Sequence, residues 1–154
     1  MELTIEQALQ QGVAAHKEGK LQEAERLYRA ILQSQPLHPD ANHNLGVIAV
    51  SVNKADAALP LLKTALKANP KIEQFWLSYI DALIKEKQFE NAKLVIEQAK
   101  TQGVAEEKLN TLEAQLPFET QIQVALQIFA PSLQLLQLAV RQLKLALRHQ
   151  LSSF

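Results

Sequence analysis

The sequence predicts an all-α fold in which helical hairpins stack into a right-handed solenoid, followed by C-terminal helices. The first observation is that Ala24, Ala58 and Ala92 recur at steps of 34 residues. The second is that each alanine is followed four positions later by a bulky residue. The third is that the period fails after Pro117, where a leucine- and glutamine-rich segment begins. A constant period of this length indicates repeated helix pairs that bury their apolar faces against one another.

The helices are predicted in order from capping residues, turn residues and hydrophobic spacing. Thr4, with Gln7 three positions later, is a capping box that begins the first helix. Gly19 marks the turn of the first pair, Pro39 marks the start of the third helix, and Gly103 closes the third repeat. We expect helices over residues 4–18, 21–34, 40–52, 55–68, 72–86, 89–101 and 105–116.

Three residues inside these helices carry further predictions. Gly12 and Gly46 stand where the two helices of a pair cross, because a residue without a side chain lets two backbones approach closely. Pro60 falls within the helix expected over 55–68, where it removes a backbone hydrogen bond. We expect a late helix start or a kink at Pro60.

The phased positions match a known repeat most clearly in the second unit. The matching residues there are Leu45, Gly46, Ala58, Leu62, Ala65 and Pro70. The third unit adds Trp76 and Tyr79, whereas the first unit has Ala8 in place of the tryptophan. This phasing resembles the tetratricopeptide repeat family, with three repeats over about residues 4–104. The resemblance implies pairs of helices A and B, with the A helices lining a concave surface.

The segment that follows the repeats is predicted to form two helices, 118–130 and 132–151, separated by Pro131. We therefore expect one domain over 4–117 and a tail over 118–154. The second tail helix carries an apolar seam at alternating steps of three and four, which suits self-association or capping. The seam residues are Leu133, Leu136, Val140, Leu143 and Leu147. Three outcomes stay open for this seam: covering the last repeat, pairing with a second copy as a homodimer, and lying on a membrane surface.

Composition excludes several classes of function. The chain has 16 basic and 16 acidic residues, so no overall field attracts nucleic acid, and no nucleic-acid partner is predicted. No cysteine is present, which removes disulfides and thiolate metal sites. The uncharged stretch 120–140 is interrupted by glutamines and Pro131, so it does not read as a membrane span. The start shows no secretory signal, and a cytoplasmic protein is expected.

The sequence contains no pattern that predicts catalysis. Phosphate-binding loops, zinc-ligand spacings and nucleophile elbows are all missing, and the four histidines include no helical pair four residues apart. The carboxylates are spread along charged helix faces, as on an ordinary protein surface. We predict a protein that is not an enzyme and that has no cofactor and no metal site.

A partner is predicted to bind on the A helices, on the face opposite the A/B packing seam. The candidate residues are Leu9, Val13, His16, Lys17, His43, Asn44, Val47, Val50, Leu77, Ser78, Asp81 and Lys85. Several are apolar and would form a hydrophobic trough, although the same spacing also suits packing between repeats.

Asn44 carries a more specific hypothesis. The resemblance implies that peptide-binding repeats of this kind use an asparagine at this position. Its amide can donate one hydrogen bond to a bound peptide backbone and accept another from it. Family members that grip a terminal carboxylate use lysine, arginine and asparagine clamps. At the corresponding positions this chain has Leu9, Val13, Asn44, Gln74 and Ser78, so only Asn44 matches. The sequence therefore does not favour a carboxylate clamp.

The function predicted from these observations is a protein-interaction scaffold that binds a peptide or partner segment in the concave groove. Two alternatives stay open. In the first, the chain is a recognition module associated with a larger enzyme of the glycosyltransferase or sulfotransferase kind. In the second, it is a structural protein that assembles through its tail.

Overall fold

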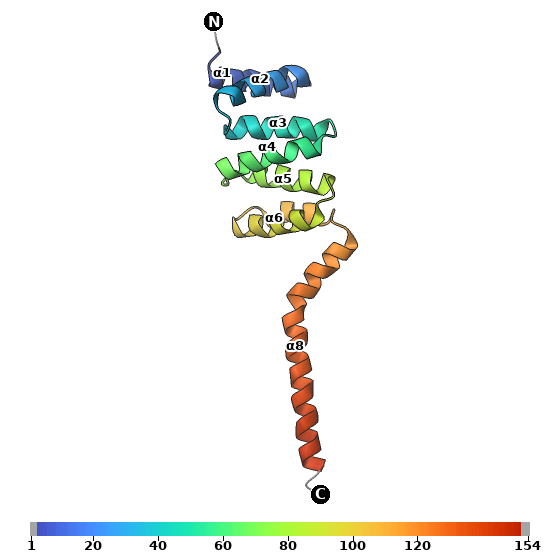
Figure 1. The fold of residues 1–154 in the computed structure, drawn as a ribbon. Helices are drawn as coiled ribbons and strands as arrows, with labels where there is room; N and C mark the ends of the chain where they lie inside the picture. The colour runs from blue at the N-terminus through green and yellow to red at the C-terminus, as the bar shows by residue number, and fades with distance from the viewer. Residues whose placement is uncertain (1–2, 152–154) are drawn as a thin grey trace. The chain divides into compact units, whose positions relative to one another are not determined.

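The structure, a computed structural model, describes residues 3–151 except the side chains of residues 121–125, 127–128, 146 and 148–151. It divides into two units, Met1–Leu116 and Pro117–Phe154, and each is described by itself. The helices, shown in Figure 1, are α1 (Ile5–Lys17), α2 (Leu21–Ser34), α3 (Pro39–Ser51), α4 (Ala55–Ala68), α5 (Glu73–Lys85), α6 (Phe89–Thr101), α7 (Glu106–Glu113) and α8 (Phe118–Leu151).

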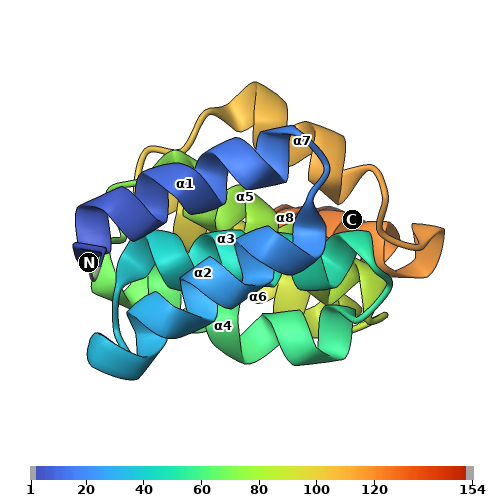
Figure 2. The same ribbon diagram turned by 90° about the horizontal axis from the view of Figure 1, so that it is seen from above.

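The first unit is a stack of three antiparallel helix pairs, α1 with α2, α3 with α4, and α5 with α6, followed by α7. Seen from above in Figure 2, helices α2, α4 and α6 lie on one side of the stack, with α1 and α7 on the other. Neighbouring A helices contact each other directly, α1 with α3, α3 with α5, and α5 with α7. The predicted all-α solenoid of helical hairpins is confirmed.

The residues that define the 34-residue period form the centre of the core. Ala24, Ala58 and Ala92 are completely buried, because each lies where a B helix meets its neighbours and a larger side chain would not fit. The bulky residues four positions later, Tyr28, Leu62 and Ile96, are also buried. The period read from the sequence therefore corresponds to the packing positions of the B helices.

The turns within the three pairs share one backbone conformation. Gly19, Asn53 and Lys87 follow one another at the repeat period and have positive φ angles of 75°, 58° and 56°. Glycine adopts this left-handed conformation without strain and asparagine tolerates it, but a lysine Cβ is crowded there. Of the three residues at this position, Lys87 is therefore the least suited to the left-handed conformation.

We expect Lys87→Gly to stabilise the chain by about 1 kcal/mol, because it relieves the strained backbone of the third turn. Lys87 is exposed and no hydrogen bond or ion pair of its side chain is seen among the described residues, so the substitution removes little else. Urea unfolding of the two proteins measures the difference. Lys93→Gly, in the middle of α6, is the matched control and is expected to destabilise. An unchanged or lower midpoint for Lys87→Gly would contradict the strain argument.

Pro60 neither delays nor divides its helix. Helix α4 begins at Ala55, as predicted, and continues through Pro60 to Ala68, so the expected late start is wrong. The proline leaves the carbonyl of Asp56 without its helical donor. Both Asp56 and Pro60 are exposed, so water can hydrate that carbonyl and the loss is tolerated.

Helix α7 occupies the place of a fourth A helix. Leu109 is completely buried in the core cluster of the third repeat. The Lys108 ammonium pairs with Glu73 of α5, and Lys100 of α6 pairs with Glu113 at 3.2 Å. These contacts fix α7 against both helices of the third pair, although the helix is shorter than the span of 105–116 that the sequence predicts.

The second unit contains one helix of 34 residues, α8, rather than two. The predicted break at Pro131 is wrong. Pro131 is exposed and deprives the carbonyl four residues earlier of its helical donor, but the helix continues past it. The flanking leucines, alanines and glutamines favour helix on both sides. Among the described helices, none combines the length and the hydropathy that crossing a bilayer requires.

Candidate functional site

The twelve residues predicted to bind a partner all lie on the A helices α1, α3 and α5. Ten of them are half-buried, and the two lysines, Lys17 and Lys85, are exposed. None is fully buried. The face read from the sequence is therefore accessible, but most of its side chains also contact the fold.

Five of the predicted residues share one small groove between α3, α4 and α5, which we call the A-helix groove. Its lining residues are Val47, Val50, Ser51, Leu62, Ser78, Asp81 and Lys85, and its volume is about 240 Å³. The two valines and Leu62 make it apolar, whereas the residues from α5 are polar or charged. The groove thus has an apolar side and a polar side.

Leu62 reaches this groove from a B helix because Gly46 has no side chain. A Cβ at Gly46 would lie 2.7 Å from both Cγ and Cδ2 of Leu62, so the leucine occupies the space that any other residue would take. Sequence reasoning missed Leu62 because it restricted the groove to A helices. The signal that could have identified it is the glycine at the helix crossing together with the leucine that keeps the repeat period.

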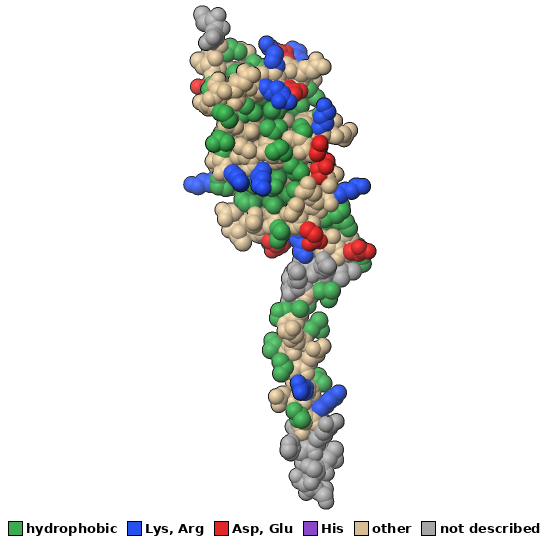
Figure 3. Space-filling view, viewed as in Figure 1, with side chains coloured by type: hydrophobic (Ala, Val, Ile, Leu, Met, Phe, Trp, Pro, Cys, Tyr) green, Lys and Arg blue, Asp and Glu red, His purple; other side chains and the backbone are tan. Residues whose placement is uncertain are grey.

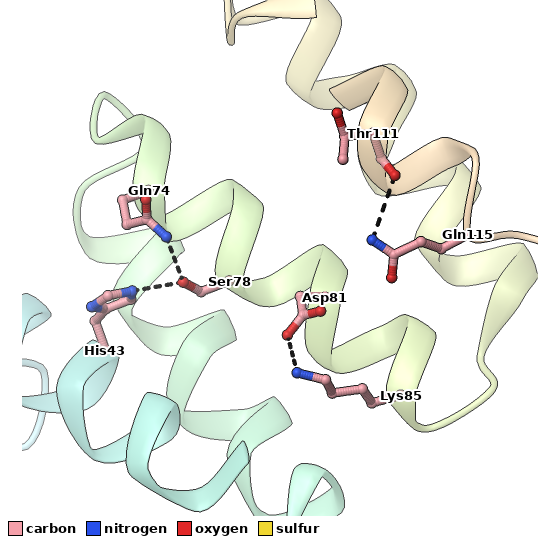
Figure 4. A network of polar contacts seen from close by, with 7 residues as sticks. All are labelled: His43, Gln74, Ser78, Asp81, Lys85, Thr111 and Gln115. Atoms are coloured by element: carbon pink, nitrogen blue, oxygen red, sulfur yellow. Dashed lines mark hydrogen bonds and ion pairs between the residues drawn. The ribbon is translucent and has the colours of Figure 1, made fainter. Parts of the chain in front are cut away.

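A hydrogen-bonded bridge joins the second and third repeats beside this groove (Figure 4). The Nε2 atom of His43 on α3 lies 2.9 Å from Oγ of Ser78 on α5. Gln74 donates to the same oxygen at 3.2 Å. The imidazole also stacks on Phe75, with ring centroids 4.6 Å apart and planes inclined by 28°. His43 and Ser78, both predicted as partner contacts, therefore first of all connect α3 to α5.

Asn44 is also engaged within the chain. Its Oδ1 atom lies 3.2 Å from Nδ1 of His43. Burial raises the pKa of Tyr28, and the nearby Asn44 amide opposes that shift, although the buried Tyr28 hydroxyl has no hydrogen-bond partner among the described residues. The amide predicted to hold a bound backbone thus contacts the His43 ring of its own fold, which occupies part of its bonding capacity.

The charged end of the A-helix groove is an ion pair on α5. Lys85 Nζ lies 2.6 Å from Oδ2 of Asp81, one helical turn away, as Figure 4 shows. Both side chains are partly exposed, so the pair contributes little to stability. It leaves the groove without net charge from these two residues.

The predicted residues of the first repeat do not join this groove. Leu9 packs against the hydrophobic cluster of the first repeat. Val13, His16 and Lys17 lie further along α1, and Leu77 packs against the cluster of the third repeat. The sequence pattern could not separate groove from packing here, because both use the same helical spacing.

We expect the stability of the chain to decrease on acidification through His43. Burial lowers the pKa of His43 below its ordinary value of 6.5, His16 acts in the same direction, and Asn44 and Asp40 oppose the shift. The folded chain therefore binds this proton less readily than the unfolded chain. The contribution is fully present above about pH 6.5 and is lost as the pH falls from there through the lowered pKa.

Urea unfolding at about pH 7.5 and pH 5.5 tests this expectation, since the interval spans the ordinary histidine pKa. His43→Phe is the comparison, because it keeps a ring on Phe75 but cannot titrate. The parent chain should lose more stability between the two pH values than the variant does. An identical loss in both proteins would show that other groups carry the pH dependence.

The described residues offer no constellation for catalysis or metal binding. No group of three or more histidine, aspartate or glutamate side chains converges within them. The polar residues that do cluster, His43, Ser78 and Gln74, lack a carboxylate hydrogen-bonded to the imidazole.

Solved structures with similar folds include the D159K mutant of MamA, with a TM-score of 0.66 and 25% identity over 80% of this chain and 69% of that one. The type III secretion translocator chaperone SycD of Yersinia enterocolitica has a TM-score of 0.67 and 14% identity, covering 80% of this chain and 90% of SycD. The O-GlcNAc transferase of Thermobaculum terrenum has a TM-score of 0.59 and 22% identity. That match covers 66% of this chain but only 20% of the transferase.

A search of curated protein sequences finds no match. Two sequence models described as tetratricopeptide repeat match residues 9–51 and 49–116, which together run from within α1 to the end of α7. The stacked hairpins, the buried alanines at the repeat period and these matches agree. The chain belongs to the tetratricopeptide repeat family.

Proposed function

We propose that this chain is a protein-interaction module that holds a segment of a partner in the A-helix groove. The observation that supports this most directly is the combination of an apolar floor, made by Val47, Val50 and Leu62, with a polar edge at Ser78 and Asp81. An apolar side chain of the partner enters the groove, and its backbone lies along the polar edge. This is the pattern by which grooves on rigid scaffolds anchor peptides.

The size of the groove favours a side chain as its occupant. Sites for small molecules usually enclose about 300–1,000 Å³. The A-helix groove, at about 240 Å³, is smaller than that range and suits one or two anchor residues. Because Asp81 and Lys85 neutralise each other, the groove does not select strongly for a charged peptide.

Peptides selected from a random displayed library on the immobilised chain test the proposal. Val50→Glu places a charge on the groove floor, and Ser51→Phe fills the groove from an exposed position without entering the core. Each variant should lower the affinity for the selected peptides by about tenfold or more. Circular dichroism establishes that both variants fold.

The matched control is Lys63→Glu with Lys67→Glu, on the outer surface of α4, away from this groove. Peptides that bind in the A-helix groove should keep their affinity for the control. If both groove variants bind as tightly as the parent chain, partners do not use this groove.

A second candidate function, self-association, is favoured by α8. The seam residues all lie on one uninterrupted helix, and all are exposed: Leu133, Leu136, Val140, Leu143 and Leu147. A leucine seam of this kind is stabilised when it packs against the seam of a second copy. The association of this chain with a larger enzyme has weaker support, since the likeness to the transferase concerns the fold alone.

A further inference from the structure

A second groove lies on the B helices, between α4 and α6, with α5 behind it. Its lining residues are Lys63, Leu66, Lys67, Pro70, Trp76, Tyr79, Asn91, Leu94, Val95 and Gln98. Its volume is about 490 Å³, and it shares no residue with the A-helix groove. We call it the B-helix groove. Figure 3 shows basic side chains beside hydrophobic ones over the middle of the first unit.

Apolar side chains form most of the B-helix groove. Leu94 is 62% exposed, so its side chain is available to contact a partner. Trp76 forms part of the wall, and its indole N–H donates to the carbonyl of Pro70 at 2.8 Å. The one polar atom of the indole is thus satisfied within the chain, and the ring is held in place.

The polar groups of this groove lie at its rim. Lys63, Lys67, Asn91 and Gln98 are all exposed, and none is a buried group directed into the groove. Small-molecule sites generally place a few polar groups convergently inside an enclosed pocket. The B-helix groove instead has an apolar floor with flexible polar side chains around it, which is the composition of a protein docking surface.

The charge of the rim is positive. Within the part of the chain that the structure describes, neither Lys63 nor Lys67 pairs with a carboxylate, whereas Lys85, Lys100 and Lys108 all do. No aspartate or glutamate lines the groove. Two adjacent ammonium groups one helical turn apart repel each other, and an acidic group between them would relieve that repulsion.

We propose that the B-helix groove docks an acidic amphipathic segment of a protein partner, with a leucine or phenylalanine over Leu94 and Trp76 and a carboxylate between Lys63 and Lys67. The tail of the same chain does not fit this description, because Glu119 is its only acidic residue and Arg141 and Lys144 are basic. This surface is independent of the A-helix groove, so one chain can hold two segments at once.

Trp76 is the only tryptophan of the chain and lines the groove, so its fluorescence reports on occupancy. The probe is a short labelled peptide with leucines on one helical face and glutamates on the other, compared with a peptide in which every glutamate is replaced by lysine. The glutamate peptide should change the Trp76 emission saturably and raise its own anisotropy. The lysine peptide should do neither.

Lys63→Glu with Lys67→Glu should lower the affinity for the glutamate peptide by about tenfold or more at low salt. Leu94→Asp should lower this affinity by a similar factor, because it removes the apolar contact. Lys93→Glu with Lys87→Glu, which changes the same net charge outside the groove, is the matched control and should have a much smaller effect. Ser51→Phe, in the A-helix groove, should leave this binding unchanged.

Three results would overturn the proposal: no binding of the glutamate peptide, equal binding of the lysine peptide, or equal weakening by the groove and control charge changes. These results leave the A-helix proposal intact, because Ser51→Phe and Val50→Glu test that groove with different peptides. If Ser51→Phe abolishes binding of the library-selected peptides, that result does not bear on the B-helix groove.

Discussion

Replacing Gly46 by valine is expected to destabilise the chain by about 3 kcal/mol. The Cβ atom alone would lie 2.7 Å from two carbons of Leu62, and valine adds two more methyl groups at the same place. Leu62 is completely buried, so it cannot move aside without displacing other core side chains. Valine is a better helix former than glycine, but that gain is only a few tenths of a kcal/mol.

Urea unfolding followed by circular dichroism measures this change. Ala14→Val is the matched control, because Ala14 lies on an exposed position of α1 and should change stability by about 0.5 kcal/mol or less. Leu62→Ala supplies the second arm of a double-mutant cycle. The combination Gly46→Val with Leu62→Ala should be less destabilised than the sum of the two single changes, because the alanine vacates the space that the valine needs.

Additive effects of these two substitutions would contradict the contact between Gly46 and Leu62 as the reason for the glycine. The contact also concerns function, since Leu62 is one of the residues that line the A-helix groove. A valine that tilts Leu62 should therefore weaken peptides bound in this groove even under conditions in which the variant remains folded. The steric argument also applies to Gly12, where a Cβ would lie 2.7 Å from a ring carbon of Tyr28.

The sequence was sufficient for the repeat architecture because the same packing problem recurs in each pair. Ala24, Ala58 and Ala92 must be small where helices meet, so the core is visible as a period. The capping box was equally local: Thr4 Oγ1 accepts from the amide of Gln7 at 3.1 Å, and the Gln7 side chain accepts from the amide of Thr4 at 3.0 Å. Interactions confined to one turn or to one repeat can therefore be predicted from the sequence.

The prolines could not be judged from the sequence, because their effect depends on solvent. A proline in a helix deprives one carbonyl of its donor, and the loss is large only where water cannot reach that carbonyl. Exposure of Pro60 and Pro131 is a property of the folded chain. Helix α4 therefore begins before Pro60, where a late start or a kink is expected from the sequence, and α8 continues through Pro131, where the sequence predicts a break.

The candidate grooves were predictable only in part, because each is made by residues from several helices. The bridge from His43 to Ser78 joins residues 35 positions apart, and nothing in either local sequence indicates it. The B-helix groove combines Trp76 of α5 with Leu94 of α6 and Lys67 of α4. Helical spacing shows which residues share a face, but not which faces leave a space between them.

The second large effect is expected in α8, where Leu136→Lys with Leu143→Lys should abolish self-association of the chain. Leu136 and Leu143 are 62% and 64% exposed and lie seven residues apart, so they occupy equivalent places two helical turns apart on one seam. Seven-residue spacing brings both onto the interface of a two-stranded coiled coil, where a lysine ammonium would be buried without a partner. Arg141 and Lys144 already make this region basic, so the added charges also increase repulsion between copies.

Light scattering at a series of concentrations checks the expectation. The parent chain should approach twice the single-chain mass of 17.2 kDa, and the variant should remain at that mass. Gln134→Lys with Gln142→Lys adds the same charge to the same helix outside the seam, and this control should associate like the parent chain. If the parent chain is monomeric, or if both lysine pairs have the same effect, the seam does not join two copies. The leucines of α8 would then have to be covered by a different partner, because an exposed apolar helix face of this length is unfavourable in water.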